Sequence, residues 1–403
     1  MSKVIIIGGG AAGYFTAINA KENNPELDIT ILEKGKDVLQ KVKISGGGRC
    51  NVTHACFEPK ELVKFYPRGE KELLGPFHQF MTGDTFEWFE NRGVPLKIED
   101  DNRVFPEANK SQAIIDCFQN AFDNLGIKVF TNCGVNSVSQ QDNKWVINTK
   151  EQVFEADKLV IAAGSSKKVW ELCETLDHDV IEPVPSLFTF NINDKRLVDL
   201  LGTSVPNATV TIAGTKLEAS GPLLITHWGM SGPAVLKLSA FGARILADKN
   251  YQYNVEVNWL SRPTDKVLNV LLNLKKKEPR KTAILKSPFA EVSKRLWERF
   301  VIAAGIKATQ NWADLNNTQL EGLANQLTKG VFNANGRTTF KDEFVTAGGV
   351  DLKEINFKRF ESRKHKNLFF VGEVLNIDAV TGGFNFQNAW TGGFICANAL
   401  AED

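Results

Sequence analysis

The chain has 403 residues, and its 48 Lys and Arg residues are balanced by 47 Asp and Glu residues. This near-zero net charge argues against a general binder of nucleic acid or anionic membrane. No apolar run reaches the roughly 18 residues of a membrane helix, and the N-terminus lacks the features of a signal peptide. We therefore expect a cytoplasmic protein with reduced thiols that contacts neither nucleic acid nor a membrane.

The N-terminal segment has the pattern of a βαβ unit. Residues 3–7 form a β-branched apolar run, residues 8–13 read GGGAAG, and a second apolar strand at 28–32 ends in Glu33. In a GxGxxG turn the first glycine permits the turn, the second lets a pyrophosphate approach the backbone, and the third lets the helix pack on the strand. The acid after the second strand accepts hydrogen bonds from a ribose. This order of features predicts a dinucleotide site at the start of the helix.

Three further segments favour FAD over NAD. Residues 45–51 read SGGGRCN, in which the glycines permit close approach to a ring or phosphate and Arg49 is able to pair with an anion. Residues 158–165 form an apolar strand that ends in Ala-Ala-Gly-Ser. Residues 367–373 form a strand that ends in Gly-Glu near the C-terminus. A helix that begins after 381–383 would direct its N-terminus at the flavin.

The middle of the chain changes from strand to helix patterns. Alternation at 209–212 and 253–257 predicts strands, and a helix is expected over 234–247. From about 263 to 330 we expect three helices, over 264–277, 289–304 and 318–329. The lysines at 275–277 are expected to be a solvated helix end rather than a binding site.

Few side chains are candidates for catalysis. His227 lies in a glycine-flanked turn, and histidine is a common acid–base residue, so a catalytic role and a structural role are both open. Cys50 has no CxxC partner and is expected to be a packed small residue rather than part of a dithiol relay. Asn385 and Gln387 either hydrogen-bond to flavin or substrate or cap the start of a helix. Cys50, His54 and Cys56 lack a second ligand pair, so no metal site is expected.

Five segments together resemble the YhiN/BaiN-like FAD-binding flavoproteins, also called the aminoacetone oxidase family, over essentially the whole chain. They are GGGAAG at 8–13, KISGGGRCNVT at 43–53, GPLLITHWGMSGPAVLKLS at 221–239, VTAGGVDLKEI at 345–355 and VGEVLNIDAVTGGFNFQNAWTGG at 371–393. The resemblance implies non-covalent FAD and a discontinuous FAD domain with two inserted modules. Family members have been linked to amine oxidation and to reduction of conjugated steroid ketones. The sequence departs from the family pattern at Asn376, usually Asp, and at Ala379, usually Gly.

The expected fold is therefore α/β, with a discontinuous Rossmann-like FAD-binding domain over 1–190 and 345–403. A β-barrel-like insert is expected over 191–262, with 335–350 as a further candidate part, and a helical insert over 263–335. The candidate cofactor-binding residues are Gly8, Gly10, Ala11, Ala12, Gly13, Glu33, Lys34, Lys41, Ser45, Gly46, Gly47, Gly48, Arg49, Cys50, Asn51, Ala162, Ala163, Gly164, Gly372, Glu373, Gly383, Asn385 and Gln387.

The expected function is an FAD-dependent oxidoreductase of a small organic substrate. NAD(P)H-linked reduction of a conjugated ketone or a related C=C or C=N bond is the leading hypothesis. An O2-dependent amine oxidase and an RNA-modifying flavoprotein are the alternatives. Because no second GxGxxG unit follows a strand, NAD(P)H is expected to visit only transiently, between the FAD domain and the insert.

Overall fold

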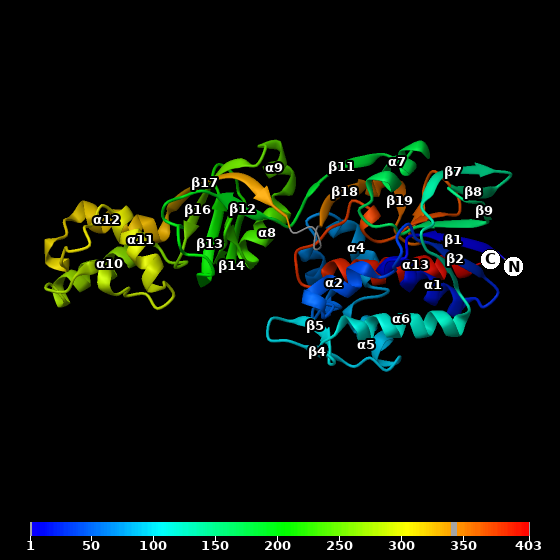
Figure 1. Ribbon diagram of the computed structural model, residues 1–403, viewed down its shortest axis with the longest axis horizontal. Coiled ribbons are helices and arrows are strands. Elements are labelled where there is room, and N and C mark those ends of the chain that lie inside the picture. Colours follow the sequence, from blue (N-terminus) through cyan, green and yellow to red (C-terminus); the bar gives the residue numbers. More distant parts are fainter. Residues whose placement is uncertain (1, 340–344, 403) are drawn as a thin grey trace. The chain divides into compact units, whose positions relative to one another are not determined.

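The computed structural model describes residues 2–339 and 345–402. The chain forms two compact units (Figure 1). The split unit comprises Met1–Val184 and Lys341–Asp403, and the inserted unit comprises Pro185–Phe340. Residues 340–344, which fall in the predicted segment 335–350, lie outside the described residues.

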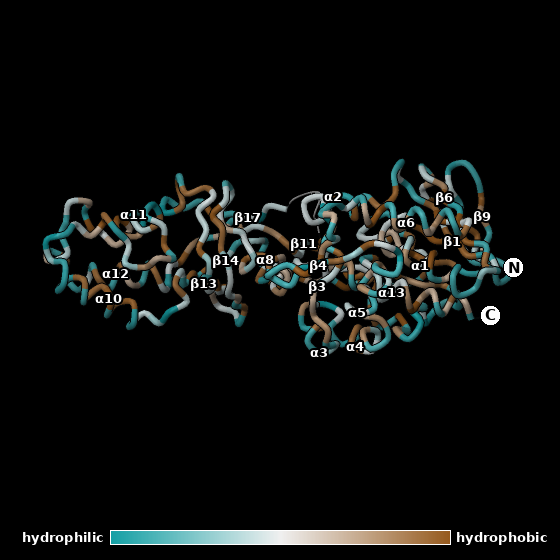
Figure 2. The backbone as a smooth tube through the Cα atoms, turned by 90° about the horizontal axis from the view of Figure 1, so that it is seen from below, coloured by the Kyte–Doolittle hydropathy of each residue, from teal (hydrophilic) through white to brown (hydrophobic). Residues whose placement is uncertain are grey.

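A seven-stranded sheet forms the centre of the split unit. Its order is β19-β20-β21-β10-β1-β2-β6, and the strands from β21 to β6 run parallel. In β1 every residue from Val4 to Ile7 is buried, as expected for a parallel strand covered on both faces, and Figure 2 shows this stretch in hydrophobic brown. The bounds are β1 Lys3–Ile7, β2 Asp28–Leu32, β6 Lys128–Phe130, β10 Lys158–Ile161, β19 Ile355–Asn356, β20 Glu361–Ser362 and β21 Leu368–Phe370.

The first and last long helices of the split unit pack along each other. Gly393 of α13 approaches α1 so closely that a Cβ there would lie 3.1 Å from Thr16 Oγ1. Phe15 and Trp390 also meet, with ring centroids 5.2 Å apart. The C-terminal helix therefore completes the core that the N-terminal βαβ unit begins. The helices are α1 Ala11–Asn23, α2 Gln40–Gly48, α3 Pro59–Leu62, α4 Glu70–Phe77, α5 Thr82–Glu90, α6 Ser111–Leu125, α7 Lys167–Thr175 and α13 Phe384–Ala401.

Three small sheets complete the split unit. Their orders are β3-β5-β4, β7-β8-β9 and β11-β18. The strands are β3 Thr53–His54, β4 Leu96–Ile98, β5 Arg103–Pro106, β7 Val135–Gln141, β8 Lys144–Thr149, β9 Val153–Ala156, β11 Val180–Pro185 and β18 Thr346–Val350. Because β11 leads toward the inserted unit and β18 follows it, their pairing holds the two chain crossings side by side.

The inserted unit is a closed barrel of order β12-β15-β14-β13-β16-β17 with helices. In β16 the residues Tyr253, Val255 and Val257 point inward and alternate with exposed neighbours, as the alternating sequence predicts. The strands are β12 Thr189–Ile192, β13 Ser204–Ile212, β14 Glu218–Ile225, β15 Gly229–Ser231, β16 Gln252–Asn258 and β17 Gly330–Thr338. The helices are α8 Pro233–Phe241, α9 Ala243–Asp248, α10 Thr264–Lys277, α11 Lys294–Ala303 and α12 Asn317–Thr328.

The predicted fold class, a Rossmann-like domain with an inserted barrel and helices, is confirmed. One hydrophobic core runs from barrel residues such as Val257 to helix residues such as Leu271 and Leu323. The further division into separate barrel and helical domains stays a prediction.

Two helix predictions were wrong in detail. The predicted helix over 289–304 begins only at Lys294, because the Ser293 hydroxyl caps it by accepting from Leu296 N at 3.4 Å. The helix predicted over 234–247 is divided at Gly242, where α8 ends and α9 follows. None of the helices in residues 2–339 and 345–402 has the length and apolarity required to cross a bilayer.

Candidate functional site

The turn between β1 and α1 is closed on its inner side and open at its tip. A Cβ on Gly8 would lie 2.5 Å from the Ala162 carbonyl oxygen, and a Cβ on Gly13 would lie 2.1 Å from the Gly8 carbonyl oxygen. Gly10 immediately precedes α1, and a Cβ there would meet no atom within 4 Å. Gly8 and Gly13 are therefore needed for the turn itself, whereas Gly10 leaves space at the helix N-terminus, where unpaired N–H groups attract a phosphate.

Glu33 is held at the carboxyl end of β2 by two backbone amides. Its Oε2 accepts from Gly9 N at 2.8 Å and its Oε1 accepts from Gly35 N at 2.7 Å. Each carboxylate oxygen keeps a further lone pair, so both remain able to accept from ribose hydroxyls. The next residue, Lys34, is exposed. The acid is thus fixed beside the glycine turn, as the GxGxxG pattern predicts.

The Gly-rich segment forms the distorted end of α2. Ser45 has an extended backbone, and Gly46 and Gly47 have positive φ angles of 58° and 68°. Gly48 also has a positive φ angle, and Cβ atoms on Gly47 or Gly48 would meet no atom within 4 Å. This segment therefore exposes bare backbone to open space, as a surface for a flat ring or a phosphate requires.

Arg49 already has protein partners. Its Nη1 donates to Glu99 Oε1 at 2.6 Å, and its guanidinium lies 3.8 Å from the centre of the Phe105 ring. The side chains of both ion-pair partners are about one-third exposed. An anionic ligand would share Arg49 with Glu99.

Cys50 and Asn51 face the protein interior. Complete burial raises the pKa of the Cys50 thiol to about 12, so the thiol stays neutral, as a packed residue would. In the orientation that satisfies its neighbours, the Asn51 amide oxygen accepts from Gly383 N at 3.0 Å, and its nitrogen donates to Thr53 O at 3.0 Å. Asn51 thereby joins the Gly-rich segment to the turn before α13.

The ends of β10 and β21 meet the N-terminal turn. Lys41 Nζ lies 2.5 Å from Glu373 Oε2, and a Cβ on Gly164 would lie 3.7 Å from the same oxygen. A Cβ on Gly372 would lie 3.0 Å from the Ala12 Cβ. The structure therefore gathers predicted residues from both ends of the chain at one edge of the parallel sheet. The Lys41–Glu373 ion pair was not predicted, because no sequence spacing relates two residues so far apart.

Two predicted residues at the start of α13 have internal partners. Gln387 is fully buried, where its Oε1 accepts from Thr53 at 2.6 Å and from Thr85 at 3.0 Å. Asn385 both accepts from Ala379 N at 3.0 Å and donates to Ala379 O at 3.3 Å. Asn385 therefore shapes the turn before α13, and Gln387 joins α13 to β3 and α5, so direct contact with a flavin stays a prediction for both.

Sequence reasoning missed His54 as part of this site. Its Nδ1 lies 3.1 Å from the Gly382 carbonyl oxygen, and its ring stacks on Phe384 with centroids 4.4 Å apart. Burial lowers the pKa of His54 and outweighs the opposing hydrogen bond to Gly382. A neutral His54 donates from Nδ1 to that carbonyl and leaves Nε2 as an acceptor.

His227 belongs to the inserted unit and lies apart in sequence from all of these residues. It is exposed in the turn between β14 and β15, where its ring packs edge-on against Trp228 with centroids 5.2 Å apart. Its catalytic role stays a prediction.

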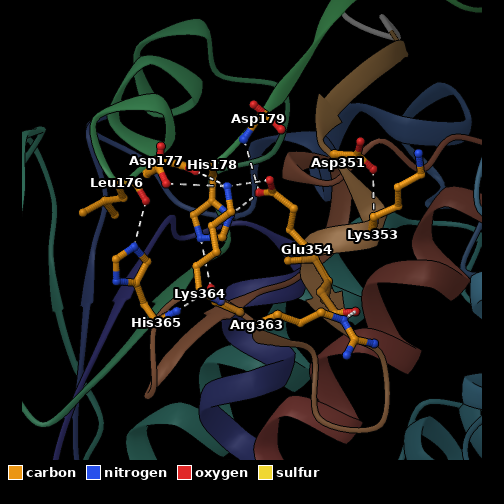
Figure 3. A network of polar contacts seen from close by, with 12 residues as sticks. Leu176, Asp177, His178, Asp179, Asp351, Lys353, Glu354, Arg363, Lys364 and His365 are labelled. Carbon is orange, nitrogen blue, oxygen red and sulfur yellow. Dashed lines mark hydrogen bonds and ion pairs between the residues drawn. The ribbon is translucent and has the colours of Figure 1, made fainter.

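A polar network in the split unit contains no predicted site residue (Figure 3). His178 is buried, its Nδ1 lies 2.6 Å from Glu354 Oε2, and its Nε2 lies 3.0 Å from Ser362 Oγ. Lys364 Nζ lies 2.7 Å from Glu354 Oε1. Burial lowers the pKa of His178, although Glu354 opposes this effect. For Glu354, burial raises the pKa, but bonds to Lys364 and His178 outweigh it and the pKa falls. The network ties the turn before β19, and Ser362 of β20, to the segment after α7.

Three curated relatives match nearly the entire chain. Two are named ribosomal RNA dihydrouridine synthase, from Haemophilus influenzae (27% identical, 100% of this chain and 99% of the relative) and from Escherichia coli (28%, 98% and 97%). The third is named 3-dehydro-bile acid delta(4,6)-reductase, from Clostridium scindens (24%, 100% of each). Among solved structures, 3-ketosteroid-delta4-(5alpha)-dehydrogenase from Rhodococcus jostii RHA1 is similar with a TM-score of 0.52. That structure is 12% identical and covers 100% of this chain and 97% of its own, which shows the shared fold.

The family model described as the HI0933-like protein Rossmann domain matches residues 2–399. This match confirms the predicted resemblance and the prediction of an enzyme of the FAD-dependent oxidoreductase class. The chain therefore belongs to the HI0933-like family.

Proposed function

We propose that this protein binds FAD at the sheet edge described above and reduces a C=C bond conjugated to a carbonyl group, with NAD(P)H as the electron donor. The observation that carries the proposal is that the open Gly10 turn and Glu373 lie at one edge of the sheet, where Glu373 is joined through Lys41 to α2, the helix that ends in the Gly47–Gly48 segment. The names of the relatives support the reaction class, because dihydrouridine formation and Δ4,6-reduction both saturate a C=C bond conjugated to a carbonyl.

The residues present fit FAD. The open space at Gly10 suits the pyrophosphate, and Glu33 is the candidate acceptor for the adenosine ribose hydroxyls. Glu373, which forms an ion pair with Lys41, is a candidate acceptor for ribitol hydroxyls. The bare backbone of Gly47 and Gly48 is a surface on which a flat ring could lie. Bound FAD would supply two-electron hydride chemistry, while the protein orients the reactants.

The overall reaction balances with one reductant and one proton. NAD(P)H gives up a hydride and becomes NAD(P)+, the carbon β to the carbonyl gains that hydride, and the α carbon gains a proton. Two protein groups are candidates to hold or deliver the proton. His54 lies at the turn before α13 with Nε2 available, and His227 remains the candidate from the inserted unit.

The uracil ring of RNA is a second candidate substrate, favoured by the charge of the inserted unit. Residues 185–340 contain 20 Lys and Arg residues and 11 Asp and Glu residues. The remainder of the chain contains 28 Lys and Arg residues and 36 Asp and Glu residues. The near-zero net charge of the whole chain therefore hides a difference in charge between its two units. An excess of positive charge on one unit is the electrostatic requirement for binding a polyanion.

Anaerobic reduction of the flavin tests the proposal. The FAD-loaded protein is mixed with NADH or NADPH, and flavin absorbance is followed. Bleaching by a nicotinamide, and recovery of colour on addition of a Δ4-3-ketosteroid or a uridine-containing RNA, is the expected result. An amine that bleaches the flavin and yields peroxide in air, with no response to NAD(P)H, would overturn the reductase in favour of an oxidase.

A further inference from the structure

The positive charge of the inserted unit is concentrated in its helical segment. Residues 262–337 contain 14 Lys and Arg residues and only 6 Asp and Glu residues. The highest density lies in two segments, which together contain seven basic and two acidic residues: 275–286, the end of α10 and the loop that follows it, and 307–315, the loop before α12. We call these two segments the basic loop pair. In Figure 1 they belong to the yellow part of the chain around α10, α11 and α12.

Backbone hydrogen bonds hold the two loops side by side. Ala283 N donates to Gln310 O, Trp312 N donates to Lys281 O, and Ala313 N donates to Pro279 O, each at 3.0 Å. Below them, Trp297 and Trp312 are buried, and Trp297 Nε1 donates to Ala283 O at 3.0 Å. The basic loop pair is therefore an anchored surface rather than a loose lysine-rich tail.

Most of its cations have no acidic partner. Lys276, Lys277, Arg280, Lys286 and Lys307 are exposed, and within the described part of the chain none of them forms an ion pair. The two acidic residues are engaged elsewhere: Glu278 pairs with Lys281 at 2.9 Å, and Asp314 accepts from Asn311 N at 3.2 Å. Five uncompensated cations on one anchored surface produce a local positive potential that a neutral protein as a whole does not have.

The basic loop pair also lies well away from the barrel. Thr264, at the start of α10, bonds to Thr328, at the end of α12, at 2.9 Å, and β17 begins two residues later. From that junction α10 extends to Lys277, and at 1.5 Å per residue its other end is about 20 Å from the barrel. A large ligand could therefore contact the loops without entering the barrel.

We infer that the basic loop pair binds the phosphate backbone of folded RNA. The inference rests on the second candidate substrate proposed above and identifies the surface that would hold it. A bilayer fits the surface less well, because the apolar side of α10, with Val267 and Leu271, is buried in the core and is not available for insertion. Several exposed Lys and Arg side chains without acidic partners instead suit the phosphates of a polyanionic backbone.

Charge reversal with a matched control tests the inference. The test variant carries Lys276→Glu, Lys277→Glu, Arg280→Glu and Lys307→Glu. The control variant reverses four exposed lysines of the split unit, and these are Lys71, Lys110, Lys144 and Lys150. Binding of a fluorescein-labelled RNA hairpin of about 30 nucleotides is measured by anisotropy across a salt series, with FAD bound and no NAD(P)H.

We expect the test variant to bind RNA at least about tenfold more weakly at 0.1 M salt and to show a shallower salt dependence, because each lost phosphate contact lowers the slope by about 0.7–0.9. The control should bind like the wild type. Equal loss in both variants, no binding by the wild type, or tighter binding to phosphatidylglycerol vesicles than to RNA would each overturn the inference. Circular dichroism and flavin absorbance establish that the variants are folded. Because NAD(P)H bleaching is measured separately, failure of RNA binding is distinguishable from failure of the reductase proposal.

Discussion

Replacing Gly10 with Ala separates the need for a glycine in the fold from the need for one in cofactor binding. Gly10 has φ of −92° and ψ of −169°, an extended conformation that alanine adopts without strain. A Cβ there meets no protein atom within 4 Å. Alanine makes the unfolded chain less flexible than glycine does, which stabilises the folded protein by about 0.4–1 kcal/mol. Alanine is also a poorer N-cap than glycine by a similar amount, so the two effects nearly cancel. We expect the free energy of unfolding of the apoprotein to change by less than about 1 kcal/mol.

The same methyl group should obstruct the cofactor, because it occupies the space through which a pyrophosphate approaches the α1 N-terminus. We expect Gly10→Ala to weaken FAD binding at least about tenfold, equivalent to about 1.4 kcal/mol. Urea unfolding of the apoprotein gives the stability change, and titration of the apoprotein with FAD, followed by quenching of flavin fluorescence, gives the affinity.

Gly13→Ala is the contrasting variant. Its Cβ would lie 2.1 Å from the Gly8 carbonyl oxygen, more than 1 Å inside ordinary contact. Overpacking of this kind costs about 1–3 kcal/mol, so this variant should lose stability as well as FAD. Wild-type FAD affinity in Gly10→Ala would refute the placement of the pyrophosphate at this turn. Equal loss of apoprotein stability in both variants would refute the structural distinction between the two glycines.

Three further outcomes are expected. His227→Ala should lower turnover strongly while FAD stays bound; unchanged turnover would exclude His227 from the reaction. Burial lowers the pKa of His178, so the unfolded chain binds a proton at this residue more readily than the folded protein does. The stability that the neutral His178 contributes above about pH 6.5 is therefore lost as the pH falls. Urea titrations at about pH 7.5 and 5.5 should therefore show a smaller loss in His178→Asn than in the wild type. Arg68→Ala removes an ion-pair partner of Asp378, whose side chain is 1% exposed, and should cost about 3–5 kcal/mol by urea unfolding. The exposed ion pair between Lys64 and Glu61 provides the control: Lys64→Ala should lower the free energy of unfolding by less than about 1 kcal/mol.

Local patterns in the sequence predicted the parts of the site that depend on backbone conformation. The turn from Gly8 to Gly13 and the position of Glu33 follow from steric rules that act within a few residues, so they could be read directly. The alternation in β16 and the helical spacing of α10 are local in the same sense.

Contacts between distant segments could not be predicted in this way. Gln387 looked available for a ligand, but its amide is bonded to Thr53 and Thr85, which lie hundreds of residues earlier. His54 gave only an incomplete metal pattern, and its relation to Gly382 depends on the packing of α13. Overall charge was also misleading, because a sum over the chain removes the difference between its two units.

The position of β21 in the sheet has a consequence for synthesis of the protein on the ribosome. β1 and β10 are made early, but β21, which pairs with β10, and the helix α13 emerge only after the entire inserted unit. The inserted unit, with its own closed barrel and core, is therefore able to fold while the earlier strands still lack their partners. The two connections of the inserted unit lead into β11 and β18, which pair with each other. Once the inserted unit has folded, the two parts of the split unit are therefore joined by an effectively short loop rather than a long one. A growing chain that has not yet reached residue 368 therefore carries a complete barrel and an incomplete sheet, and the edge of β10 stays unpaired until β21 emerges.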